Sequence, residues 1–507
     1  MEELISHFFS FFKHTLKFLN HYSGLLMMGT PVLVIIAAFI YDVNQKKHTI
    51  RRNFPVIGIA RYFLELIGPE LRQYLFHDER SDRPIPRYIR SWVYAHSKKQ
   101  LGTVAFGTKK DIDKPGTLLI RHSAFPKNID EKSYPSDHRL VIGSKRRKPY
   151  LASRFNIAGM SYGALGKNAI QALSNGAKLA ECYHNTGEGG VSSYHLDSGA
   201  NLVVQIGTAK FGVRDKEGNF SEEKFLELAK QDNVKMFEIK ISQGAKPGKG
   251  GVLPKEKISE EIAEIRGIEM GEDVISPPAH KEWEDEYGLL KWIDYLQKLS
   301  GKPVGIKFCL GRKRFINHLI KAMRETKIMP DFISVDGAEG ATGAAPLAHT
   351  DYLGYPLKDA IMFIDNKLRD SGLREEIKLN ASGKIITGAD LAIIIALGAD
   401  MASGARGFML SIGCIHALKC NTNHCPAGIA THDPWLQRGL VIETKISRVP
   451  NYHHAVLHEF TSLLHACGYE KPEDLKREDV MKVVDFHKII PMNEIVPQPP
   501  LKACKQA

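Results

Sequence analysis

The chain of 507 residues has little cysteine and no long run of charge. Its seven cysteines are an odd number and three of them lie within 414–425, so they do not indicate a disulfide framework and they fit a reducing compartment. The net charge of +12 comes from scattered basic residues in short runs such as 145–148. Such a distribution favours a solvated surface over a nucleic-acid partner. We expect neither disulfides nor bound nucleic acid.

Two nucleotide-binding motifs are also absent. The sequence contains no GxGxxG fingerprint, so we do not expect a dinucleotide fold for NADPH or FAD. The glycine–lysine pairs in Lys246–Gly251 are not a P-loop, because their spacing is wrong and no serine or threonine follows the lysine. If the chain carries out redox chemistry, its electrons must therefore come from a partner.

The segment from Phe18 to Tyr41 contains no Asp, Glu, Lys or Arg, and its part from Leu25 onward is strongly apolar. Its length predicts one transmembrane helix, about 23–41, in a membrane anchor of residues 1–45; a buried core helix is the alternative. More basic residues follow this segment than precede it, at Lys46, Lys47, Arg51 and Arg52. By the positive-inside rule we expect a single-pass anchor in membrane lipid, with the N-terminus outside and the catalytic domain in the cytoplasm.

From Arg154 onward the sequence repeats a pattern of strand, glycine turn and helix. This alternation predicts a parallel sheet, and two phosphate-type turns near its end favour an α/β fold, a (β/α)8 TIM-type barrel with insertions. The expected strands are Phe155–Ala158, Cys182–Asn185, Met236–Ile241, Val304–Phe308, Phe332–Val335, Ile377–Asn380 and Ala399–Ala402, with the eighth at Leu202–Ile206 or near Ile275. We place the barrel at 151–435, after a region of 46–150 that packs beside it and before a helical extension of 436–507.

Two glycine turns and three cysteines follow one another closely near the end of this pattern. The turns are Ser382-Gly383-Lys384 and Gly404-Ala405-Arg406, and each would leave backbone N–H groups free to bind one phosphate. Cys414, Cys420 and Cys425 come next and are close enough for one loop to wrap an inorganic cluster. A phosphate seat joined to such a loop suggests a flavin nucleotide beside an electron source.

The three cysteines could alternatively bind zinc together with His416 or His424, which lie nearby in the sequence. Zinc sites commonly use closer pairs such as C-x2-C, which this loop lacks. A proline after the last cysteine is also seen in ferredoxin-type cluster loops. We therefore expect an iron–sulfur cluster, and leave open a vacant site or a 4Fe–4S cluster with an outside ligand.

Barrel enzymes place their active sites where the strands end, so residues at these points are further candidates. Gly159, Met160 and Ser161 follow the first strand, where glycine would let the backbone approach a flat ring; an ordinary turn is the alternative. Lys307 lies inside an apolar strand, where a lysine is seldom buried without a partner. A fixed cation at that position would stabilise the negative charge of a reduced flavin.

Loops after other strands carry more polar candidates. Gln243 and Lys246 belong to a basic, glycine-rich loop that suits a dicarboxylate substrate. Glu188 lies in the glycine-rich turn of 185–190, and Asp336 follows another expected strand. Taken singly, Glu188 could be a solvated side chain and Asp336 could serve turn chemistry.

Several blocks of the sequence resemble the FMN-binding domain of glutamate synthase and the stand-alone, membrane-tethered members of that family. The blocks are NTGEGG (185–190), QGAKPGKGG (243–251), ISPPAH (275–280), DGAEGATGAAP (336–346) and the cysteine block. The resemblance covers about Arg90 to Gly468. It implies FMN, held at its phosphate by the two glycine turns, and a 3Fe–4S cluster held by Cys414, Cys420 and Cys425.

The resemblance also implies roles for individual residues. Gly159–Ser161 would line one face of the flavin ring, and Gln205 and Lys307 would contact the ring. Glu188 would lie near the place where ammonia meets the flavin. Asp336 would line the site.

The implied reaction is the reductive amination of 2-oxoglutarate, or a related 2-oxo acid, with ammonia or an amine to give glutamate. Electrons would pass from an unidentified donor, such as a ferredoxin, a reductase subunit or a quinone-linked carrier, through the cluster to FMN. Two alternatives stay open. One is an FMN oxidoreductase acting on another amino or N-methyl amino acid, as in N-methylglutamate synthase, and the other is an electron-transfer subunit of a membrane complex.

Overall fold

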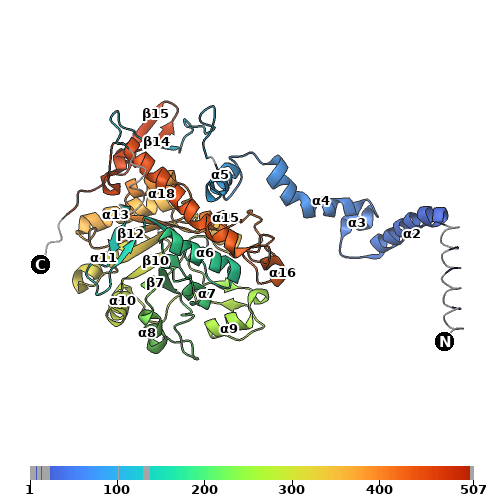
Figure 1. Cartoon of the computed structure of the whole chain (residues 1–507), viewed down its shortest axis with the longest axis horizontal. Coiled ribbons are helices and arrows are strands. Elements are labelled where there is room, and N and C mark those ends of the chain that lie inside the picture. The colour runs from blue at the N-terminus through green and yellow to red at the C-terminus, as the bar shows by residue number, and fades with distance from the viewer. Residues whose placement is uncertain are drawn as a thin grey trace. The chain divides into compact units, whose positions relative to one another are not determined.

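The computed structural model describes residues 7, 13, 17, 23–100, 102–128 and 138–502 of the chain. The chain divides into two compact units, 1–84 and 85–507. The larger unit contains a closed barrel with its surrounding helices, and the described part of the smaller unit is helical (Figure 1). This division differs from the expected boundaries at 45 and 150, because residues 85–150 belong to the barrel unit.

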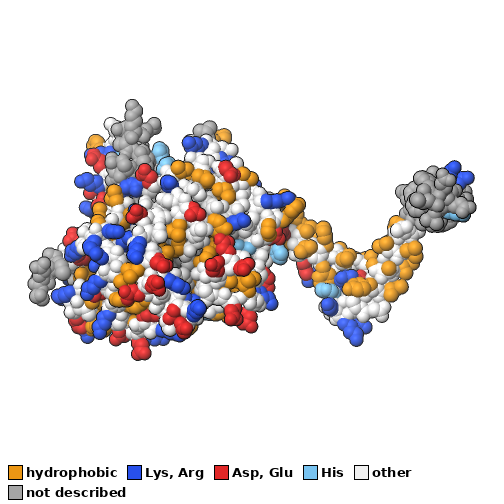
Figure 2. Space-filling model, turned by 60° about the horizontal axis from the view of Figure 1, so that its bottom comes forward, with side chains coloured by type: hydrophobic (Ala, Val, Ile, Leu, Met, Phe, Trp, Pro, Cys, Tyr) orange, Lys and Arg blue, Asp and Glu red, His pale blue; other side chains and the backbone are white. Residues whose placement is uncertain are grey.

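From residue 23 onward the smaller unit is a succession of helices. They are α2 (Ser23–Asn44), α3 (Thr49–Asn53), α4 (Gly58–Leu71) and a π-helical turn, η1 (Arg72–Phe76). The buried carboxylate of Asp42 joins α2 to α3, because it pairs with Arg51 and accepts a hydrogen bond from the Val56 N–H at 2.9 Å. Figure 2 shows apolar side chains on the surface of this unit. Ile57 and Leu66 are among the exposed ones.

The helix at residues 23–41 is not the predicted membrane span. Among the described residues no helix is long and apolar enough to cross a membrane. The apolar run of α2, from Leu25 to Tyr41, would extend about 25 Å, against roughly 30 Å for a bilayer core. The prediction of a single-pass, N-out anchor in membrane lipid is therefore wrong, and the cytoplasmic placement deduced from it falls with it. Residues 18–22 of the charge-free stretch lie outside the described residues.

Eight parallel strands close into a barrel, which confirms the predicted TIM-type α/β fold. They are β4 (Phe155–Ile157), β5 (His184–Asn185), β6 (Leu202–Ile206), β7 (Val234–Lys240), β10 (Val304–Phe308), β11 (Phe332–Asp336), β12 (Lys378–Ser382) and β13 (Met401–Gly404). The circle closes where β13 pairs with β4, with Gly404 opposite Ile157. The eighth strand is therefore β6, whereas Val274–Ile275 forms β9 and pairs with β8 (Val252–Leu253) outside the barrel.

Helices follow the strands, most of them on the outside of the barrel (Figure 1). They are α6 (Lys167–Ala180), α7 (Ser193–Leu196), α8 (Glu222–Lys230), α9 (Glu260–Arg266), α10 (Glu286–Ser300), α11 (Arg314–Thr326), α12 (Leu347–Tyr352), α13 (Leu357–Ser371), α14 (Gly388–Ala396) and α15 (Arg406–Ser411). Of these, α9 and α12 belong to the loops after β7 and β11. In α10, for example, Leu289, Ile293 and Leu296 recur at helical spacing and are buried. The side chain of Asp285 caps this helix by accepting a hydrogen bond from the Gly288 N–H at 2.7 Å.

An apolar layer closes the amino-terminal end of the barrel. The hairpin of β2 (Leu140–Ile142) and β3 (Tyr150–Ala152) packs there against side chains from the starts of the strands, among them Met236 and Phe332. Gly305 of β10 makes room for Phe332, since a Cβ at position 305 would lie 2.5 Å from its ring. The interior is thus plugged at this end, which leaves the opposite end for ligands.

The residues after the barrel are only partly helical. They form α16 (Pro434–Gln437), α17 (Ile442–Ile446), α18 (Arg448–Ala466), the strands β14 (Val480–Asp485) and β15 (Lys488–Pro491), and α19 (Met492–Ile495). β14 pairs antiparallel with both β15 and β1 (Leu118–Ile120), so segments from before and after the barrel share one small sheet. α18 packs against α6, α14 and α5 (Arg87–Ser97). The expected helical extension of 436–507 is therefore built into the barrel unit.

One buried carboxylate holds the C-terminal residues to the barrel. Asp365 of α13 is fully buried and pairs with Arg369 at 2.9 Å and with Arg374 at 2.8 Å. Arg477, beyond α18 in the chain, reaches the same carboxylate at 3.1 Å, and the Gln498 side chain donates to it at 2.8 Å. Because an unpaired buried charge costs several kcal/mol, these partners fix the C-terminal segment firmly.

Replacing Gly305 by alanine tests the apolar layer. The added methyl group would meet the Phe332 ring, so we expect the free energy of unfolding, measured by urea denaturation, to fall by about 1–3 kcal/mol. Gly311→Ala is the control, because a methyl group at that position has no neighbour within 4 Å and should change stability by less than about 0.5 kcal/mol. Equal stability of the two variants would contradict this description of the layer.

Candidate active site

The two glycine turns of the predicted phosphate seat lie side by side at the carboxyl end of the barrel. They follow β12 and β13, which pair with Ser382 opposite Ser403. The guanidinium of Arg406, at the start of α15, donates a hydrogen bond to the Glu339 carbonyl oxygen at 2.7 Å. Burial lowers the pKa of Arg406, and among the salt bridges of the described residues none includes it. A half-buried cation thus lies beside the two glycine turns.

The turn after β4 packs tightly against the turn after β5. A Cβ at Gly159 would lie 2.8 Å from Asn185 Oδ1, and one at Gly187 would lie 2.6 Å from the Ser161 backbone nitrogen. Gly187 also has a φ of 66°, a backbone conformation that favours glycine. Gly159, Ser161 and the buried Met160 are therefore held in place at the barrel mouth.

Lys307 is buried near the end of β10, with its Nζ 4.0 Å from a carboxylate oxygen of Asp336. Burial works to lower the pKa of Lys307, but the charges of Asp336 and Glu238 outweigh it and raise the pKa. Asp336 also accepts a hydrogen bond from the Gly244 N–H at 2.7 Å, which fixes the loop after β7. Lys307 is therefore held as a buried cation in the barrel mouth.

A ring of polar side chains lines the inside of the barrel, on the carboxyl side of the apolar layer. One carboxylate oxygen of the buried Glu238 accepts from Asn185 Nδ2 at 2.8 Å and from Gln205 Nε2 at 2.7 Å. Its other oxygen accepts from the Ser334 hydroxyl at 2.5 Å. Ser334 Oγ in turn accepts from Asn380 Nδ2 at 2.9 Å, and Asn380 Oδ1 accepts from the Ser403 hydroxyl at 3.1 Å. The Ser403 and Tyr183 hydroxyl oxygens lie 2.8 Å apart.

A cluster of charge lies beside this ring, where the loop after β7 meets the turn after β5. Glu188 pairs with Lys240 at 2.6 Å. Burial works to raise the pKa of Glu188, but the charges of Lys240 and of two further cations outweigh it and lower the pKa. The two cations are Lys246 and Arg266, whose own pKa values burial lowers to about 8 and about 10. Gln243 lines a cavity of about 20 Å³ here, together with Glu188 and Lys240.

Two of these cations, Lys240 and Arg266, are not among the site residues expected from the sequence. Lys240 comes two positions after Glu238 in the same strand, so the two-residue period of a strand could have placed it on the inward face. Arg266 lies on α9, outside the pattern of strand ends, and donates to the Tyr162 carbonyl oxygen at 3.1 Å. No local signal marks it, because its place depends on how the segment between β7 and α10 folds back.

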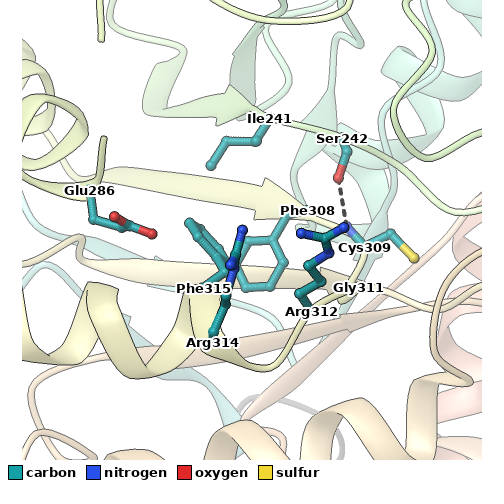
Figure 3. A pocket seen from close by; sticks show the side chains of 9 residues that line it. All are labelled: Ile241, Ser242, Glu286, Phe308, Cys309, Gly311, Arg312, Arg314 and Phe315. Carbon is teal, nitrogen blue, oxygen red and sulfur yellow. Dashed lines mark hydrogen bonds between the residues drawn. The ribbon is translucent and has the colours of Figure 1, made fainter. Parts of the chain in front are cut away.

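A larger cavity of about 360 Å³ shares Ile241 and Ser242 with the small one (Figure 3). The rest of its lining is Glu286, Phe308, Cys309, Gly311, Arg312, Arg314 and Phe315. Ser242 accepts a hydrogen bond from the Cys309 N–H at 3.0 Å, which joins the loops after β7 and β10. This lining contains no residue of the predicted site, so the larger cavity adjoins the site and is not part of it.

The three predicted cluster cysteines lie in one loop after α15, and their thiols influence one another. Burial raises the pKa of the Cys414 thiol to about 12, and the nearby Cys420 and Cys425 act in the same direction. The ammonium of Lys257 donates to the Cys420 carbonyl oxygen at 3.2 Å and to the Ala164 carbonyl oxygen at 2.6 Å. The cysteine loop is thereby tied to the turn after β4.

Among the described residues no three His, Cys, Asp or Glu side chains are grouped to hold one metal ion. The zinc alternative therefore has no support, and Nδ1 of His416 lies 2.9 Å from the Arg90 guanidinium instead. An iron–sulfur cluster makes a different demand, because each iron takes its own thiolate and the sulfur atoms do not converge on one point.

The buried Lys246 makes stability depend on pH. Its pKa is lowered from 10.5 to about 8, so between these values the unfolded chain binds more protons than the folded chain. Its contribution to the free energy of unfolding therefore rises with pH in this window, by up to about 1.4 kcal/mol per pH unit. We expect Lys246→Gln to flatten that rise relative to the wild type in urea denaturation between about pH 8 and pH 10. Lys216→Gln is the control, because it changes an exposed lysine and should keep the wild-type slope. A wild-type slope in K246Q as well would contradict the assignment of this pH dependence to Lys246.

Comparison with known proteins identifies the family. Residues 107–470 match the conserved region in glutamate synthase. The glutamate synthase large subunit-like protein YerD of Bacillus subtilis is 37% identical over 510 residues, which cover 93% of this chain and 97% of YerD. The archaeal glutamate synthase (NADPH) of Methanocaldococcus jannaschii is 36% identical, over 63% of this chain and 60% of its own length. The chain thus spans about three fifths of that relative.

A solved structure of mandelate oxidase with (S)-4-hydroxymandelic acid is 12% identical, with a TM-score of 0.45, over 72% of this chain and 87% of that chain. A likeness at that level carries no argument. The match to the family over residues 107–470 and the near-complete overlap with YerD are sufficient to assign the family. The chain therefore belongs to the FMN-binding glutamate synthase family and is an oxidoreductase.

Proposed function

We propose that the chain forms glutamate by reductive amination of 2-oxoglutarate with ammonia, and that FMN is its hydride donor. The observation that carries the proposal is the group of three cations, Lys240, Lys246 and Arg266, around the single carboxylate of Glu188. Their net positive charge suits a substrate with two carboxylates. The relatives that are named glutamate synthases agree with such a substrate.

Two of the cations are free to bind the substrate. Arg266 Nε is buried and has no hydrogen-bond partner among the described residues. Lys246 is buried and takes part in no salt bridge within the described part of the chain. We assign one substrate carboxylate to each of them. Glu188, held by Lys240, would then be the hydrogen-bond acceptor that orients ammonia.

The residues at the barrel mouth fit FMN. Ser382–Lys384 and Gly404–Arg406 would hold its phosphate, since the two turns follow neighbouring strands and the Arg406 guanidinium supplies a positive charge beside them. Lys307 would stabilise negative charge on the flavin ring. When bound, FMN supplies a hydride to the carbon–nitrogen double bond formed from the oxo acid and ammonia.

Other residues would position the ring. Gly159–Ser161 would line one face, because the contacts with the turn after β5 already fix their backbone. Gln205 would donate or accept a hydrogen bond at the ring edge, and Asp336 would keep Lys307 in place from 4.0 Å. Each of these residues binds or orients and none needs to change its charge during the reaction.

We also propose a 3Fe–4S cluster at Cys414, Cys420 and Cys425. Burial raises the pKa of the Cys414 and Cys420 thiols, and the charges of Arg90 and Lys257 act in the opposite direction, towards the ionised form that binds iron. When bound, the cluster supplies single electrons. Their source would be a partner such as a ferredoxin or a reductase subunit, because the sequence has no dinucleotide fingerprint.

An anaerobic titration tests the proposed function. Purified full-length chain is reduced with dithionite while absorbance is recorded, and is then mixed with 2-oxoglutarate and ammonium. We expect the flavin absorbance to bleach, and to return only when both substrates are present, with glutamate formed in equal amount. Bleaching without return would replace this substrate pair by another amine or by an electron-transfer role. A chain without flavin would overturn the proposal.

Arg266→Gln is the variant for the substrate part of this experiment. Loss of a charge-assisted hydrogen bond should raise KM for 2-oxoglutarate about 10- to 100-fold while the FMN content stays unchanged. Arg214→Gln is a matched control, because Arg214 and Arg266 both lie 5.0 Å from the centre of the Phe211 ring. A KM that rises equally in both variants would show that lost packing, and not lost charge, is responsible.

Cys420→Ser tests the cluster assignment. We expect it to lower bound iron from three per chain to fewer than one and to abolish the EPR signal, while FMN stays bound because the phosphate turns are untouched. Cys467→Ser is the control, since that buried cysteine lies near the end of α18, away from the loop. Full iron content in C420S would remove Cys420 from the ligand set.

A further inference from the structure

Glu238 is a buried carboxylate that the proposed reaction does not use. Its exposed fraction is 2%, and it lies in β7 on the inside of the barrel. Its three recorded hydrogen-bond donors, on Asn185, Gln205 and Ser334, are all neutral. Among the described residues it takes part in no salt bridge. A buried charge without a direct counter-ion is costly, so a charge in this position calls for a role.

The carboxylate determines the orientation of two amides. It can only accept hydrogen bonds, so Asn185 and Gln205 must both turn their NH2 groups towards it. Asn185 Oδ1 then faces the Gly187 N–H and accepts from it at 3.0 Å. Gln205 Oε1 accepts no recorded hydrogen bond from the described residues. Gln205 therefore offers a fixed acceptor at the level of the barrel that the turn after β4 covers.

The same carboxylate acts on Lys307. Its charge is one of those that hold Lys307 protonated in its buried position. Glu238 also reaches across β10 to β11, where the Ser334 hydroxyl donates to it at 2.5 Å.

We propose that Glu238 is a positioning residue of the flavin site, which orients the amides of Asn185 and Gln205 and balances the charge of Lys307. This inference rests on the proposed FMN site. With the carboxylate in place, Gln205 presents a carbonyl oxygen to an N–H or hydroxyl donor of the cofactor. With a neutral amide at position 238, the carbonyl oxygen would keep the Asn185 and Gln205 donors and the NH2 group would face Ser334, whose hydroxyl would have to accept instead of donating. The negative charge that balances Lys307 would be lost.

The midpoint potential of bound flavin tests the inference with a readout that folding alone does not move. Glu238→Gln removes a negative charge near the ring, so we expect the protein to favour reduced over oxidised flavin at least tenfold more than the wild type does. This is a rise of about 30 mV for a two-electron couple. The visible spectrum of the oxidised flavin should shift as well.

Asp331→Asn is the matched control. Asp331 is also a buried carboxylate of the barrel and accepts from the Val304 N–H at 2.8 Å and from Gln297 at 2.9 Å. It precedes β11, at the amino-terminal end of the strands, whereas the flavin site lies at the other end. D331N should therefore lose stability and keep the wild-type potential.

Ser334→Ala covers the case in which E238Q does not fold. It removes one donor to Glu238, so the carboxylate charge is less compensated, and we expect the ratio of reduced to oxidised flavin to fall at least threefold. Wild-type potentials in both variants, with FMN still bound, would overturn the role of Glu238 and leave the proposed function standing. A wild-type chain without FMN would overturn the proposed function, and this inference with it.

Discussion

The hydrogen bonds from Asn185 and Gln205 to Glu238 join three neighbouring strands at the level where the barrel interior changes from apolar to polar. Below this level the β2–β3 hairpin and side chains such as Phe332 keep water out. Above it lies Lys307, whose charge depends on the carboxylates around it. Because the plugged interior has a low effective dielectric, each of these charges acts on its neighbours more strongly than it would in water.

One segment of the chain supplies three cations of the candidate site that do not lie on strands. The residues between β7 and α10, 241–285, contribute Lys246 and Arg266 to the charge cluster and Lys257 to the cysteine loop. The segment is held from both sides, because Asp336 accepts from the Gly244 N–H and Thr208 donates to the Pro277 carbonyl oxygen at 2.7 Å. A dicarboxylate bound by this segment would therefore depend on the same structural support as the cysteine loop.

The sequence predicts those parts of the site that depend on local pattern. Alternation of strands and helices predicts the barrel, and a lysine inside an apolar strand is enough to single out Lys307. Arg266 and Glu238 could not be found in this way, since the Ser334 that binds Glu238 is 96 positions further along the chain. The membrane prediction fails for another reason. It rests on the absence of charged residues, but the apolar run from 25 to 41 is shorter than a bilayer core is thick.

The cysteine loop and the turn after β4 are joined by contacts that a sequence does not reveal. Lys257 bridges the carbonyl oxygens of Ala164 and Cys420, and Nε2 of His432 lies 2.9 Å from the Gly163 carbonyl oxygen. The turn that begins at Gly159 is therefore fixed on one side by the amides that Glu238 orients and on the other by the cysteine loop. A displacement of the loop would move the backbone that is proposed to line the flavin ring. These contacts would then fix the separation of two redox groups at these places.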